Sequence, residues 1–153
     1  MNLGPLILLA ALLQTPSTTD QHKHWAEVTH KFETAPLDED AAHDAGLVVS
    51  EIAVSSDFHV TMCKDIYNDF NESDYRFHAQ VRWLYMLGAA TYQVESGKTA
   101  QPDTNLYAIH SVLKGYAAIL REKPTATDKK LDELAKLDAK NKLADYIAKK
   151  NCK

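Results

Sequence analysis

The sequence predicts an all-α fold. Beyond residue 20, apolar residues recur at spacings of three and four almost everywhere, which is the periodicity of an amphipathic helix. No run of alternating Val, Ile or Thr bounded by turn residues competes with that pattern. The chain has only 5 Gly and 5 Pro in 153 residues, which is few for a turn-rich protein. Its length favours a single helical domain, expected over residues 18–153.

Two helices are expected in the first half of the chain. Asp20 is suited to cap the first helix, which ends before Pro36. Asp38 is suited to open the second, which runs toward Tyr67 and is long enough for an interruption near Ser55. The residues expected to point inward from this second helix are Leu47, Ile52, Val54, Phe58 and Met62.

Three further helices are expected in the second half. Gly97 is suited to close the third in the left-handed conformation. Asp103 is suited to cap the fourth, which stops at Pro124, and Asp128 to cap the fifth, which continues to the C-terminus. Because short connections favour antiparallel neighbours, we expect about five helices in an up-and-down bundle or a short stack of antiparallel helical hairpins.

Residues 84–124 resemble a tetratricopeptide-type helical hairpin. In that family a Gly lets the two helices approach each other and a Pro ends the second. The resemblance implies a helical-hairpin scaffold in this part of the chain. The chain is also similar to small helical proteins exported by bacteria. The residues that carry the hairpin resemblance are Leu84, Leu87, Gly88, Tyr116 and Pro124.

Residues 1–17 are expected to be a signal peptide. The apolar run from Leu3 to Leu13 is too short to span a hydrocarbon core of roughly 30 Å, but it has the length of a secretory h-region. No Lys or Arg precedes the run, so the usual positive n-region is incomplete, and a retained apolar helix is the alternative. We therefore expect a periplasmic or secreted protein without a membrane span once the leader is removed.

The two cysteines, Cys63 and Cys152, both fall in the expected mature domain. In an oxidising compartment the simplest outcome is one disulfide between them, and two unrelated free thiols are the alternative. Neither belongs to a Cys-x-x-Cys pair, so a thioredoxin-type redox function has no support.

Charge is unevenly distributed around a formal net charge of -4. Residues 33–74 contain eleven Asp or Glu against the single base Lys64, whereas the chain from Arg121 onward contains ten Lys or Arg against six Asp or Glu. Solvated helix faces explain this pattern, and a bipolar surface that binds a charged partner is the functional reading. The absence of a global basic field argues against a nucleic-acid partner.

A metal-binding bundle is the alternative function. Glu and His three residues apart can share one helical face, as in carboxylate-bridged di-iron bundles. A His-x-His pair offers imidazole ligands for zinc or copper, although two imidazoles do not complete a tetrahedral site. The later helices offer only one terminal Glu each, so the leading interpretation includes no cofactor. The candidate metal ligands are His22, His24, Glu27 and His30.

Aromatic residues crowd the third expected helix, where they either pack in the core or form an interaction surface. The sequence has no Gly-x-Ser-x-Gly, no His-Glu-x-x-His and no phosphate-binding glycine loop. We therefore expect an exported, non-catalytic interaction or scaffold module, not an enzyme, whose partner is another protein. The residues of the possible interaction surface are Tyr75, Trp83, Tyr85 and Tyr92.

Overall fold

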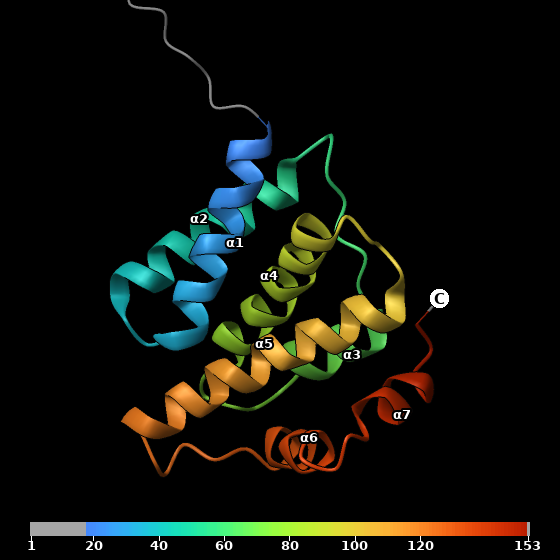
Figure 1. Cartoon of the computed structure of the whole chain (residues 1–153). Helices are drawn as coiled ribbons and strands as arrows, with labels where there is room; N and C mark the ends of the chain where they lie inside the picture. The colour runs from blue at the N-terminus through green and yellow to red at the C-terminus, as the bar shows by residue number, and fades with distance from the viewer. Residues whose placement is uncertain (1–17, 153) are drawn as a thin grey trace, which may run out of the picture.

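The computed structural model describes residues 18–152 and confirms the all-α class (Figure 1). The expected signal peptide, residues 1–17, lies outside this range. The described part has seven helices, so the expected count of about five is wrong. The helices are α1 (Thr18–Thr34), α2 (Glu39–Val54), α3 (Lys64–Asn71), α4 (His78–Ser96), α5 (Gln101–Glu122), α6 (Lys129–Asp138) and α7 (Leu143–Ala148).

Two of the expected helices are each divided into two. α2 ends at Val54 because Ser55 is extended, with φ -65° and ψ 130°, and the Ser55 hydroxyl accepts a hydrogen bond from the Phe58 N–H at 3.1 Å. This confirms the interruption expected near Ser55. A second break separates α6 from α7, where Asn141 adopts φ 55°. Asn tolerates this left-handed conformation better than most residues, but the apolar spacing around it gave no sign of a break.

Helix ends follow local sequence signals at three positions. The Asp38 carboxylate accepts from the Ala41 N–H at 2.9 Å, and the Asp128 carboxylate accepts from the Leu131 N–H at 2.9 Å. Gly97 follows α4 with φ 67°, a conformation that glycine adopts without a steric cost. The expected ends of α2, α4 and α6 are therefore confirmed.

α4 and α5 run in opposite directions through the middle of the molecule and share its most extensive helix interface (Figure 1). α1 packs against both of them, and α2 packs against α1 and α4. α3 packs against α4, while α6 and α7 lie along α5 and against each other. The helices thus pack in layers around the α4–α5 pair.

Gly88 lets α4 and α5 approach closely. A Cβ atom added at Gly88 would lie 2.7 Å from Ser111 Cβ and 3.0 Å from Ala108 Cα. Both distances are shorter than van der Waals contact, so only a residue without a side chain fits here at the observed helix spacing.

Candidate functional site

Cys63 and Cys152 form a disulfide, which confirms the expected pairing. Their Cα atoms are 4.5 Å apart although 89 positions separate them in the chain. Cys63 is fully buried just before α3, and its N–H donates to Asn105 Oδ1 at 2.9 Å. Cys152 follows α7 and is partly exposed. The bond therefore ties the C-terminal segment to the beginning of α3.

A charge cluster around Asp69 joins the same parts of the chain. Asp69 Oδ2 accepts from Lys150 Nζ at 2.7 Å, from Lys130 Nζ at 3.0 Å and from the Tyr146 hydroxyl at 3.1 Å. Burial acts to raise the pKa of Asp69, but the hydrogen bonds from Lys150 and Lys130 outweigh it and hold that pKa below its ordinary value. α3, α6 and α7 are thus connected through one carboxylate.

The candidate metal ligands of α1 do not come together. The His22 ring stacks on Trp25 with centroids 4.8 Å apart, Glu27 pairs with Lys23 at 3.9 Å, and His24 is exposed. Within residues 18–152, no group of three or more His, Cys, Asp or Glu side chains is placed to hold a metal ion. The predicted ligand set was His22, His24, Glu27 and His30.

A buried carboxylate between α1 and α5 was missed by the sequence analysis. Glu33 is 3% exposed, and its Oε1 accepts a hydrogen bond from the Ser111 hydroxyl at 2.5 Å. Its Oε2 lies 3.1 Å from Lys114 Nζ and 3.3 Å from His30 Nδ1. The other ring nitrogen of His30 lies 2.9 Å from Glu95 Oε1 on α4. His30 therefore bridges a buried and an exposed carboxylate, and we call these five residues the Glu33 cluster.

The contacts within the Glu33 cluster determine the pKa of His30 and the accessibility of the Ser111 hydroxyl. Partial burial acts to lower the pKa of His30, but the hydrogen bonds to Glu95 and Glu33 outweigh it and raise that pKa above its ordinary value of 6.5. Ser111 is fully buried and its hydroxyl donates a hydrogen bond to Glu33, so this hydroxyl is not presented to a substrate as a nucleophile. The arrangement suits a polar link between three helices.

One sequence signal does point to Glu33. It lies eight residues after Trp25 and four after Thr29, which places all three on the buried face of α1. A carboxylate on a buried face requires partners. Its partners on α5 lie 78 and 81 positions further along the chain. The residues around Glu33 therefore do not indicate which side chains these are.

Of the four residues of the possible aromatic interaction surface, two are buried and two are half-buried. Tyr85 is fully buried and Tyr75 is 7% exposed, and the hydroxyls of both donate to internal acceptors. Trp83 and Tyr92 are half-buried and pack against rings of other helices. The spacing that places these aromatics on α4 and just before it serves helix packing.

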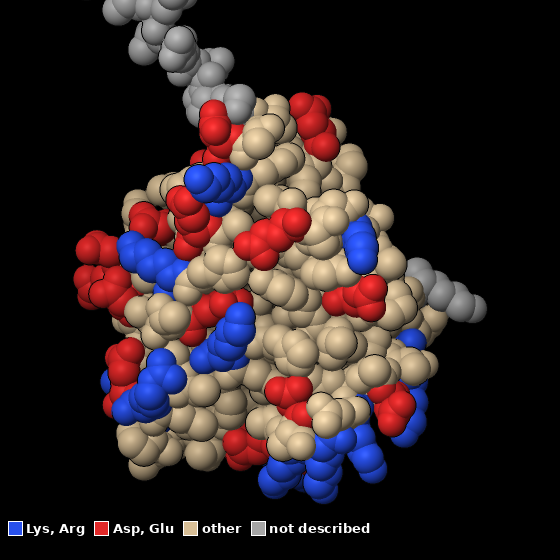
Figure 2. Space-filling model, viewed as in Figure 1, with Lys and Arg blue, Asp and Glu red and all other residues tan. Residues whose placement is uncertain are grey.

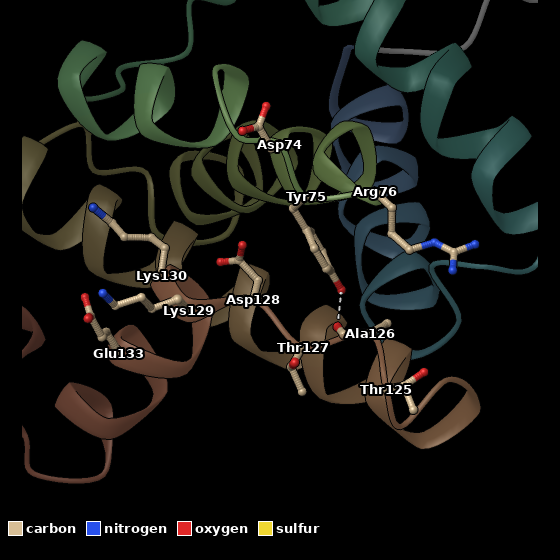
Figure 3. Close-up of a pocket in the computed structure, with 10 residues that line it drawn as sticks. All are labelled: Asp74, Tyr75, Arg76, Thr125, Ala126, Thr127, Asp128, Lys129, Lys130 and Glu133. Atoms are coloured by element: carbon tan, nitrogen blue, oxygen red, sulfur yellow. Dashed lines mark hydrogen bonds between the residues drawn. The ribbon is translucent and has the colours of Figure 1, made fainter.

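A polar hollow of about 670 Å³ lies where the turn before α4 meets the start of α6 (Figure 3). The Tyr75 ring forms one wall, and its hydroxyl donates to the Ala126 carbonyl at 2.9 Å. Figure 3 shows Arg76 and Lys130 extending to opposite sides, with the Asp128 carboxylate between them. Because both signs of charge line the hollow, it selects neither an anion nor a cation.

On the face shown in Figure 2, acidic and basic side chains gather in different places, while elsewhere Asp69 of the acidic region pairs with Lys130 and Lys150 of the basic one. Acidic side chains gather over the beginning of α2, and basic side chains gather over α6 at the bottom of the view. The formal net charge of -4 therefore combines two local fields of opposite sign.

The outer face of α2 carries two exposed apolar side chains among polar ones, and the expectation that Leu47 and Val54 point inward is wrong. Leu47 is 53% exposed and Val54 is 83% exposed, and no other large hydrophobic residue of the described part is exposed. Apolar residues occur on both sides of α2, so the sequence alone did not show which of them are buried. The residues that α2 actually buries are Ala41, Ala45, Val48 and Ile52.

Comparisons of this chain with protein-family models, with curated proteins and with solved structures found no match. The resemblances to tetratricopeptide hairpins and to exported bacterial helical proteins therefore stay predictions. Among the helices of residues 18–152, none is both long enough and apolar enough to cross a membrane.

Proposed function

We propose that the chain is an exported, non-catalytic helical module that binds another protein through the outer face of α2. The observation that carries this proposal is the exposure of Leu47 and Val54. Singly exposed apolar residues are ordinary, but contiguous apolar surface marks interaction sites. Leu47 and Val54 lie seven residues apart, so they share one face of a single helix.

Export is supported by two features of the chain. A disulfide persists in oxidising compartments and is rare in the cytosol, and Cys63 is paired with Cys152. Residues 1–17 carry the apolar run typical of a secretory leader.

A non-catalytic role is supported by the contacts of the Glu33 cluster. Both ring nitrogens of His30 contact carboxylates, and the Ser111 hydroxyl donates a hydrogen bond to Glu33. General acid–base or nucleophilic catalysis requires such groups to face a substrate, whereas Ser111 and Glu33 are buried.

The binding function is tested by photo-crosslinking in the source cells. A benzoylphenylalanine in place of Val54 is expected to give one dominant protein adduct, because that side chain faces solvent on the proposed surface. The matched control carries the same group in place of Ala117, which is exposed on α5, a helix that does not pack against α2. No adduct at Val54, or the same adducts at both positions, would contradict the proposal.

Export and the metal alternative are tested separately. The mass of the purified native protein is expected to show loss of the leader and an intact disulfide, and a cytosolic protein retaining Met1 would contradict export. Calorimetric titration with zinc and copper separates the two functions, because stoichiometric uptake at micromolar concentrations would favour metal binding through the α1 histidines.

A further inference from the structure

We infer that the outer face of α2 binds a basic amphipathic helix of another protein, an inference that rests on the function proposed above. The exposed residues of this face recur at spacings of three and four along two and more turns. Such a pattern matches the anchor positions of helix-to-helix recognition. The face, called the α2 face below, consists of Asp40, His43, Leu47, Ser50 and Val54.

The shape of the α2 face suits a second helix. Leu47 and Val54 are two helical turns apart, about 10 Å along the axis, and Ser50 lies between them. Gly46 and Ala53 flank this line, so the surface is low and a helix backbone can approach it closely. The space beside Gly46 is taken by Trp83 of α4, whose nearest ring carbon would lie 3.2 Å from an added Cβ.

The acidic residues of α2 indicate the charge that a partner should carry. α2 carries Glu39, Asp40, Asp44 and Glu51 and has no Lys or Arg. Glu39 and Asp40 are exposed in the first turn, at the end of the α2 face opposite Val54. A partner helix with an apolar stripe and flanking Lys or Arg would complement both the apolar and the acidic parts of this surface.

The same charge count disfavours two other occupants. Asp44 pairs with Lys31 of α1 and Glu51 accepts from Trp25, so Glu39 and Asp40 are the acidic residues that α2 offers to a partner. The α2 of a second copy carries no Lys or Arg to pair with them. An anionic lipid surface attracts basic segments rather than acidic ones. The basic surface of α6 on a second copy remains an outcome that the experiment separates.

The inference is tested by measuring how a labelled peptide binds to the protein with its disulfide intact, using fluorescence anisotropy. The probe is an 18-residue helical peptide of Leu, Ala and Lys, with Leu at helical spacing and Lys on its flanks. We expect this peptide to bind and a matched peptide with Glu in place of every Lys not to bind. Equal binding of both peptides would overturn the charge argument.

Two variants separate the apolar contribution from the electrostatic one. The uncharged double substitution Leu47→Gln with Val54→Gln is expected to weaken binding by about tenfold or more, because it removes the apolar anchors. Glu39→Gln with Asp40→Asn is expected to weaken binding by about threefold and to reduce its salt dependence. The control Ala117→Gln is expected to leave affinity unchanged, and circular dichroism checks that all variants fold. Unchanged affinity of the Leu47 and Val54 variant would overturn the inference.

Three further outcomes are informative. If sedimentation of the protein alone shows assembly that the Leu47 and Val54 substitutions abolish, the occupant is a second copy and the inference is overturned. If Val54 crosslinks in cells to a segment without Lys or Arg, the interaction function stands and the basic partner is overturned. If the basic peptide binds the α2 face but Val54 gives no cellular adduct, the proposed function fails while the recognition chemistry stands.

Discussion

Glu33 is the one Asp, Glu, Lys or Arg side chain that is buried among residues 18–152. A buried carboxylate is tolerated only when hydrogen bonds and opposite charge compensate for lost hydration. Ser111 and Lys114 provide this compensation from α5, and His30 provides it from α1. The Glu33 carboxylate therefore helps to hold α1 against α5.

Glu33→Gln tests that role at the residue scale. We expect it to lower the free energy of unfolding by about 1–3 kcal/mol, because the amide cannot match the charge of Lys114 or accept at both positions. Glu95→Gln is the control, since Glu95 is exposed and its loss is expected to cost less than about 0.5 kcal/mol. Urea unfolding measures both, and equal losses would contradict a special role for Glu33.

His30 adds a pH dependence to the same cluster. Its pKa in the folded protein is raised above its ordinary value of 6.5, so folding favours the protonated ring. Its contribution to stability is complete below 6.5 and is lost as the pH rises through the raised pKa. In urea unfolding across this range, His30→Gln is expected to flatten the decline in stability with rising pH. His24→Gln, on the exposed side of α1, is expected to keep the parent slope.

At the scale of the elements, the α4–α5 interface depends on the absence of a side chain at Gly88. Ala is about 1 kcal/mol more favourable than Gly inside a helix, so propensity alone favours replacement. A Cβ at Gly88 would however meet the Ala108 backbone at 3.0 Å, which cannot move without displacing α5. Packing therefore outweighs propensity at this position.

Gly88→Ala is accordingly expected to reduce stability by about 1–3 kcal/mol despite the gain in propensity. Gly46→Ala is the matched control, because it has the same gain in propensity and its Cβ meets only the half-buried Trp83 ring, at 3.2 Å. We expect Gly46→Ala to be neutral or slightly stabilising. Thermal unfolding of both variants checks the comparison, and a stable Gly88→Ala protein would show that α4 and α5 can move apart.

Sequence predicted the elements where the signal is local. Asp38, Gly97 and Asp128 mark helix ends through contacts within a few residues, and the structure confirms them. The break at Asn141 and the outward position of Leu47 were not predicted, because each depends on which surface the neighbouring helices cover. The candidate site was predicted less well than the fold, since its contacts join residues that are far apart in the chain.

At the scale of the whole molecule, the C-terminal segment is fixed to the first half of the chain twice. The disulfide joins Cys152 to Cys63, and the Asp69 carboxylate holds Lys130 and Lys150. Both connections end at α3 or immediately before it, and α7 otherwise packs only against α5 and α6. A covalent bond and a charged contact thus restrain this segment, together with the hydrogen bond from the Asn151 N–H to Asp65 and the burial of Leu143 and Ile147.

Replacing both cysteines tests the covalent connection. A bond between residues 89 positions apart restricts the unfolded chain by about 4–5 kcal/mol in the chain-entropy model. We expect the double substitution Cys63→Ala with Cys152→Ala to lower stability by up to this amount. Hydrogen exchange is expected to show α7 losing protection before α4 and α5, and uniform loss across all helices would contradict a local anchoring role.

Asp69→Asn tests the electrostatic connection and how it couples to the covalent one. The pKa of Asp69 is lowered in the folded protein, so its contribution is present above its ordinary value of 3.8 and is lost as the pH falls through the lowered pKa. Asp69→Asn is therefore expected to destabilise the protein at neutral pH and to weaken its acid sensitivity. In a double-mutant cycle with the cysteine variant, the two losses are expected to be non-additive, because both contacts restrain the same segment. Additive losses in urea unfolding would show instead that α7 is held independently by each contact.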